Sequence, residues 1–139
     1  MSHSTKPQTL VLVLKKDEEI VAEIKKYCQT NKITGGWLSG LGAVSGVELA
    51  FYNLKDKRFT QKKIDQELEI VSLVGNVATL DNDTTTHIHA VLSDINMKPI
   101  AGHLISATVA ATCEIKLEVF DQAIKRKYND HIGLNLIGG

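Results

Sequence analysis

A long alternation of apolar and polar residues in the last third of the chain is the strongest constraint on its fold. The apolar positions are Val109, Ala111, Cys113, Ile115, Leu117 and Val119, and between them lie Thr108, Ala110, Thr112, Glu114, Lys116 and Glu118. Successive side chains of a β-strand point to opposite faces of a sheet. The pattern therefore predicts a long strand with one face in the core and the other facing water or an interface.

One segment of the chain has the spacing of an amphipathic helix. It follows Asp17, and its apolar face would carry Ile20, Val21, Ile24, Tyr27 and Cys28. Asp17 is the expected N-cap of this helix. Asn31 is expected to end it in the left-handed conformation.

The remaining segments predict strands and turns. Strands are expected near Thr9–Leu14, Val47–Tyr52, Leu68–Val77, Thr84–Leu92 and Ile132–Ile137, with a short helical turn around 121–127. Five glycines between Gly35 and Gly46 predict bulges, bends or close backbone contacts. The chain has 139 residues, 43% of them apolar, which suits one core. We therefore expect an α+β fold with mostly antiparallel strands, in which a disordered tail (1–8) precedes a single domain (9–139).

Charge and cysteine content narrow the classes of partner and compartment. The 16 basic and 16 acidic residues give no net charge, so no long-range field draws the chain to nucleic acid or to a membrane. The early apolar run Leu10–Leu14 is too short for a signal peptide or a membrane span. A soluble cytoplasmic protein without a membrane partner is expected. Cys28 and Cys113 lie on apolar faces and are predicted to be reduced core residues.

The basic residues form short clusters that predict solvated faces. The clusters are Lys15–Lys16, Lys25–Lys26, Lys62–Lys63 and Lys125–Lys127. Only two of the 16 basic residues are arginine, the side chain that best reads bases, and no helix-turn-helix or zinc-finger pattern is present.

Three histidines are candidate metal ligands. In the strand expected over Thr84–Leu92, alternation puts His87 and His89 on one face, about 6.6 Å apart along the strand. If the segment at His103 pairs with this strand, three imidazoles converge in an open metal site. The alternative is a hydrogen-bonded His pair on a polar face. A hydrolytic site would also need a carboxylate as a general base. The candidates are Asp81, Asp83 and Asp94, and the sequence alone does not show which way their side chains point.

Several motifs together resemble the plants-and-prokaryotes-conserved (PPC) domain over nearly the full chain. These are Gly40–Val44, Val47–Tyr52, Leu68–Asn76, His87–Leu92, Gly102–Leu104 and Thr112–Ile115. The resemblance implies an α+β fold with a strongly bent antiparallel sheet and a homotrimer. It also implies a three-His metal site at His87, His89 and His103, with zinc as the first choice of divalent metal.

The chain also departs from the family pattern. Ala101 replaces the first glycine of the GGHL motif, and Asp17 replaces a glycine before the helix. The minor-groove AT-hook of plant members is absent. Three functions stay open: a DNA-binding or regulatory interaction module, a metal-dependent enzyme acting on a small molecule, and a structural trimer whose histidines only stabilise the fold.

Overall fold

The computed structural model describes residues 8–138, which form one helix and eight strands. In chain order these are β1 (Gln8–Lys15), α1 (Ile20–Thr30), β2 (Gly36–Asn53), β3 (Arg58–Ile64), β4 (Leu68–Leu80), β5 (Asp83–Ser93), β6 (Pro99–Val119), β7 (Arg126–Asn129) and β8 (Leu134–Ile137). The tail expected over 1–8 lies outside the described residues except for Gln8, which begins β1.

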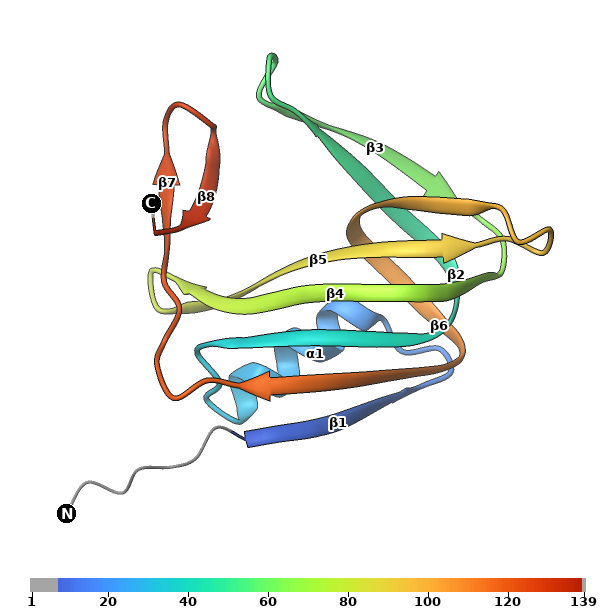
Figure 1. Ribbon diagram of the computed structural model, residues 1–139, viewed down its shortest axis with the longest axis horizontal. Helices are drawn as coiled ribbons and strands as arrows, with labels where there is room; N and C mark the ends of the chain where they lie inside the picture. Colours follow the sequence, from blue (N-terminus) through green and yellow to red (C-terminus); the bar gives the residue numbers. More distant parts are fainter. Residues whose placement is uncertain (1–7, 139) are drawn as a thin grey trace.

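The strands form a mostly antiparallel, strongly bent sheet around two long strands, β2 and β6 (Figure 1). The sheet order is β1-β6-β5-β4-β2-β3, and β6 also pairs with β2. Since β2 contacts β4 on one side and β6 on the other, and β5 joins β4 to β6, these four strands close on themselves. The C-terminal β7–β8 hairpin is a separate two-stranded sheet.

The glycine-rich part of β2 bends the sheet, as the sequence predicted. The register between β2 and β6 shifts after Gly42 and again between Ser45 and Leu49. A Cβ at Gly42 would lie 2.2 Å from the carbonyl oxygen of Thr112, so only glycine lets the two backbones approach here.

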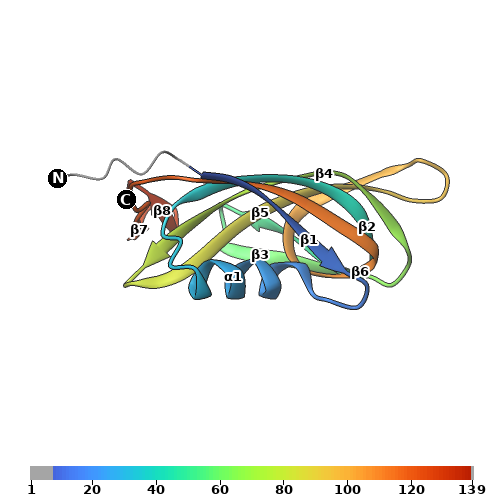
Figure 2. The same cartoon turned by 90° about the horizontal axis from the view of Figure 1, so that it is seen from below.

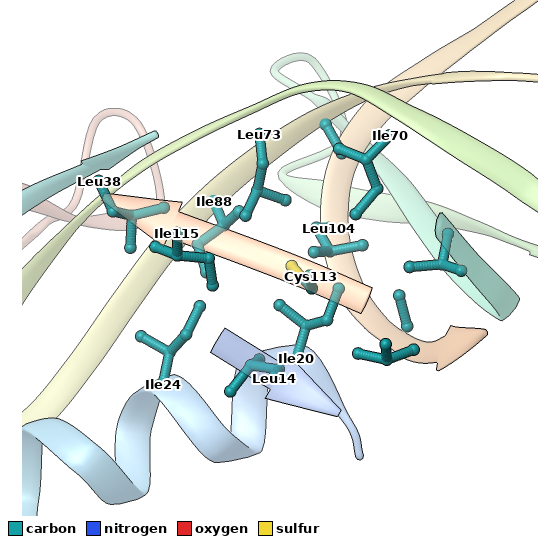
Figure 3. Packing of buried hydrophobic residues seen from close by; sticks show 14 of the residues in the cluster. Leu14, Ile20, Ile24, Leu38, Ile70, Leu73, Ile88, Leu104, Cys113 and Ile115 are labelled. Atoms are coloured by element: carbon teal, nitrogen blue, oxygen red, sulfur yellow. The ribbon is translucent and has the colours of Figure 1, made fainter. Parts of the chain in front are cut away.

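The alternation in β6 builds the core. Val109, Cys113, Ile115 and Leu117 are fully buried, which confirms the predicted strand. Ala111 is exposed instead, because β6 carries extra residues at the bend. Val109 and Cys113 are four residues apart in β6, whereas their partners in β2, Val44 and Gly42, are only two apart. We call the side of the sheet that packs on α1 the inner face and the opposite side the outer face. Figure 2 shows α1 lying on one side of the strands, and Figure 3 shows its apolar side chains pointing into the core.

Two details of the helix ends differ from the expectation. The N-cap is Glu19, whose carboxylate accepts hydrogen bonds from the backbone N–H groups of Val21 and Ala22. Asp17 has a φ of +76°, so it takes the turn conformation that glycine would favour. At the other end Lys32 (φ +53°), and not Asn31 (φ −96°), has the left-handed conformation.

The C-terminal region also differs, because the helical turn expected around 121–127 is absent. Residues 126–129 are a strand, β7, which is held against the sheet through Ile124: the carbonyl of Ile124 accepts a hydrogen bond from Thr79 N at 2.8 Å. This contact fixes where the hairpin leaves the sheet edge.

Both cysteines are free and buried, as predicted. Burial raises the pKa of each thiol to about 11, so neither is a reactive thiolate near neutral pH. Among residues 8–138, no helix has the length and apolar character needed to cross a membrane.

Candidate metal site

Two neighbouring strands bring the three candidate histidines together on the outer face. Alternation in β5 buries Ile88 in the core and turns His87 and His89 to the outer face. His103 of β6 lies directly opposite His89 in the antiparallel register. The three ring centroids are 4.9 to 5.6 Å apart. The pairing on which the three-His hypothesis depended is therefore present.

The surroundings of His87 and His103 favour the neutral form of these two imidazoles. The Nε2 atoms of His87 and His89 are 3.1 Å apart, so one ring donates a hydrogen bond and the other accepts it. Burial lowers the pKa of His87, and the neighbouring charges of His89, His103 and Arg126 lower it further, to about 4. Burial and His89 also lower the pKa of His103. Neutral imidazole is the form that binds a metal ion.

The donor set fits a divalent metal such as zinc. The candidate ligand atoms of the three histidines all lie within 4.8 Å of one another. Two nitrogens bound to one tetrahedral zinc at about 2.0–2.1 Å would be about 3.3 Å apart, close to the separation of the His87 and His89 Nε2 atoms. Rotation of the His103 ring would complete the set. Three protein nitrogens would leave a fourth position on the metal open to a ligand.

A cavity of about 820 Å³ adjoins the histidines. Most of its lining is apolar or aromatic, including Tyr52, Phe59, Val74, Val91, Leu134 and Leu136. Its walls come from β4, β5, the β7–β8 hairpin and the hairpin of β2 and β3 over residues 47–64, which we call the β2–β3 arm. Figure 1 shows the arm and the β7–β8 hairpin rising from the same side of the sheet. The volume is typical of a site for a small molecule.

The two hairpins are tied to each other across this cavity. The Tyr52 hydroxyl donates a hydrogen bond to the carbonyl of Ile132 at 2.6 Å, and Lys57 Nζ donates one to the carbonyl of Asp130 at 2.7 Å. The ring of Phe59 packs on His103 with centroids 5.2 Å apart. These contacts fix the arm and the hairpin as walls of the cavity.

Arg126 is the site residue that sequence reasoning missed. Its cluster, Lys125–Lys127, was expected to be solvated, but the Arg126 side chain is half-buried and lines the cavity. Its Nη2 donates to Asn76 Oδ1 at 2.7 Å and its Nη1 to the carbonyl of Asn135 at 2.9 Å. No spacing in the sequence signals this, because β7 reaches the histidines only through the tertiary fold.

The acids considered as general bases lie elsewhere. Asp83 faces Lys25 at 3.9 Å, and the carboxylate of Asp94 accepts hydrogen bonds from the backbone of its own turn. Among the described residues, those that line the cavity include no aspartate or glutamate.

Comparison with solved structures gives close matches along almost the full chain. A putative DNA-binding protein from Bacteroides thetaiotaomicron is 27% identical, with a TM-score of 0.90 and coverage of 95% of each chain. A plant- and prokaryote-conserved (PPC) protein from Pyrococcus horikoshii is 25% identical, with a TM-score of 0.88 and coverage of 99% of this chain and 96% of that one. A metal-containing protein from Archaeoglobus fulgidus is 29% identical, with a TM-score of 0.86 and coverage of 94% and 92%.

A search of curated proteins finds no match. The family model of the Plants and Prokaryotes Conserved (PCC) domain, the same family that is abbreviated PPC, matches residues 1–121. That match spans all the strands that carry the histidines. The chain therefore belongs to the Plants and Prokaryotes Conserved domain family.

Proposed function

We propose that this chain is a homotrimeric DNA-binding or regulatory module that holds a divalent metal, zinc, at His87, His89 and His103. The observation that carries the proposal is the convergence of three imidazoles beside a cavity of small-molecule size. A bound zinc ion would supply a Lewis acid with one open position for a ligand oxygen. The metal-containing relative from Archaeoglobus fulgidus supports this assignment.

The metal content of the purified chain tests the site. Tag-free protein, prepared without chelators and reloaded with zinc, should hold close to one metal ion per chain. The double variant His87→Ala/His89→Ala should hold almost none, because one imidazole cannot retain the ion. His131→Ala is the matched control, since His131 lies in the β7–β8 turn outside the three-His group. Absence of metal after reloading would remove the metal from the proposal.

The DNA-binding part rests on the relatives and on local charge. The relative from Bacteroides thetaiotaomicron bears a DNA-binding name. In this chain the β2–β3 arm carries Lys57, Arg58, Lys62 and Lys63, all exposed, although the net charge of the chain is zero. A local basic patch on a neutral protein is expected to bind duplex DNA weakly and in a strongly salt-dependent way.

Duplex binding at low salt tests this part. Fluorescence anisotropy with a labelled duplex should detect binding that weakens as salt rises. Lys62→Glu/Lys63→Glu should weaken it further, whereas Lys25→Glu/Lys26→Glu on α1 should have little effect. No binding by the unmodified chain at low salt would leave a regulatory module that acts without direct DNA contact.

The trimer is supported by apolar side chains that the outer face leaves exposed. Val11, Val13, Leu41 and Val71 are 54–68% exposed. Val13 of β1 and Leu41 of β2 both lie opposite Glu114 of β6, so they belong to one face of the sheet. Exposed apolar side chains on one face of a sheet favour association between chains.

A metal-dependent enzyme acting on a small molecule is the second candidate. The specific observation that favours it is the cavity beside the open side of the histidine cluster. Turnover that is lost both on chelation and in His89→Ala would establish it. The cavity lining described above lacks a carboxylate, so polar groups such as Arg126, Thr85 and the histidines are the ones available to orient a substrate.

A further inference from the structure

We infer that the cavity binds a small carboxylic acid that carries an apolar group, with its carboxylate held by Arg126 next to the three histidines. The inference deepens the proposed function and rests on it for one point only, that the metal offers a second contact to the carboxylate. The contact with Arg126 does not depend on a metal.

Among the described residues, the guanidinium of Arg126 has no ionic partner, and only some of its N–H donors have an acceptor. Its two hydrogen bonds go to uncharged acceptors, the side-chain oxygen of Asn76 and the carbonyl of Asn135. A guanidinium has five N–H donors, so three of them have no acceptor among the residues that the structure describes. None of the ion pairs found between described residues includes Arg126. Burial lowers the pKa of Arg126, which reflects the cost of holding an uncompensated charge there.

The position of Arg126 directs this charge toward the histidines. Asn76, which orients the guanidinium, lies opposite His87 in the β4–β5 register and is 7% exposed. Arg126 and His87 both line the cavity. Because the described residues that line the cavity include no aspartate or glutamate, a carboxylate that enters meets the Arg126 guanidinium without repulsion from a neighbouring acid.

Thr85 is a further polar residue of the lining, and its hydroxyl lacks a hydrogen-bond partner among the described residues. Thr85 is on the same face of β5 as His87, and its buried Oγ1 makes no hydrogen bond with the described residues. An unsatisfied buried hydroxyl is costly. Thr85 lines the cavity, so a change of its χ1 rotamer would let this hydroxyl donate a hydrogen bond to a ligand oxygen there.

The rest of the lining selects the remainder of the ligand. Side chains such as Phe59, Val91 and Leu136 surround the polar end, and the volume of about 820 Å³ admits a ring or a branched alkyl group. Among the described residues that line the cavity, Arg126 is the one lysine or arginine. Such a lining suits a monoanion better than a dianion, because a second charge would be buried without a partner. Carboxylate is therefore favoured over inorganic phosphate.

Calorimetry with benzoate tests the inference, and benzamide is the uncharged probe of the same shape. Zinc-loaded and metal-free full-length chains should both bind benzoate at least about tenfold more tightly than benzamide, with the loaded chain binding more tightly of the two. Arg126→Gln should lose at least about tenfold in benzoate affinity in both forms. Lys127→Gln, at the exposed neighbour on β7, should lose nothing.

A second variant protects the test against a folding defect in Arg126→Gln. Thr85→Val keeps the shape of the side chain and removes the unpartnered hydroxyl, so it should keep or raise the melting temperature while benzoate affinity falls severalfold. Equal affinity for benzoate and benzamide, or unchanged benzoate affinity in a folded Arg126→Gln variant, would overturn the inference. Failure to bind zinc overturns the metal proposal alone, provided that the metal-free chain still binds benzoate through Arg126.

Discussion

Gly75 shows how one missing side chain sets the geometry of the histidine strand. It lies opposite Ile88 in the β4–β5 register. A Cβ at this position would be 2.4 Å from the carbonyl oxygen of His87 and 2.8 Å from Ile88 Cγ1. The backbone of β5 can therefore approach β4 only because residue 75 is glycine. The two metal-site histidines of β5 flank this contact.

Gly75→Ala is expected to destabilise the fold by about 1–3 kcal/mol, because the added methyl group forces β5 away from β4. Zinc affinity should fall with it, since His87 and His89 move relative to His103. Urea unfolding and metal content measure the two effects. Ala111→Val adds carbon at an exposed position of β6 and should change stability by less than about 0.5 kcal/mol. Equal stability of Gly75→Ala and the unmodified chain would contradict this account.

Among the elements, α1 depends on a cap that also joins it to the sheet. The carboxylate of Glu19 accepts hydrogen bonds from Val21 and Ala22 in the first turn, and from the backbone N–H of Ala107 in β6 at 3.1 Å. The same side chain thus satisfies two free donors of the helix and anchors its N-terminus at the bend of β6.

Glu19→Ala should cost about 1–3 kcal/mol of unfolding free energy, because three backbone N–H groups, two of them half-buried, lose their acceptor. Asp17→Gly should cost nothing or stabilise slightly, because glycine adopts the positive φ of this residue without strain. Thermal and urea unfolding of both variants compare the two positions directly. The reverse ranking would mean that Asp17 is the cap after all.

For the chain as a unit, the distribution of apolar surface is the feature that bears on assembly. The inner face is covered by α1, and its core side chains are almost completely buried. On the outer face, β1 exposes Val11 (68%) and Val13 (59%), and β2 exposes Leu41 (54%). A sheet covered on one face only leaves such side chains for a second chain to bury.

Light scattering should therefore give a mass close to three chains. Val13→Glu/Leu41→Glu should shift the mass to that of one chain while circular dichroism still shows a folded sheet, since these residues contribute little to the core. Ile95→Glu, at a 92% exposed position in the β5–β6 turn, is the matched control and should remain trimeric. A monomeric unmodified chain would remove the trimer from the proposed function.

Much of this structure could be predicted because its signals are local. The alternation in β6 and the helical spacing after Asp17 follow from which side chains must avoid water, and both elements form where the patterns place them. The His87 and His89 pair was found in the same way, since strand alternation alone puts two residues i and i+2 on one face.

The helix cap and the exposed Ala111 could not be predicted, because each depends on contacts between distant segments. Glu19 is selected over Asp17 by a hydrogen bond to β6, and Ala111 leaves the core at a bend imposed by the close approach of Gly42. The same applies to Arg126, which only the folding of β7 over the outer face brings beside Asn76.

Local patterning thus specified most of the strands, the helix and two of the three histidines, because side-chain alternation and helical spacing are properties of short segments. The path of the backbone between those segments specified the rest. The pairing of β5 with β6 brought His103 to the other two histidines, and the β7–β8 hairpin closed the cavity with a cation at its wall. Such long-range contacts arise from packing the entire core, and no short stretch of residues encodes them.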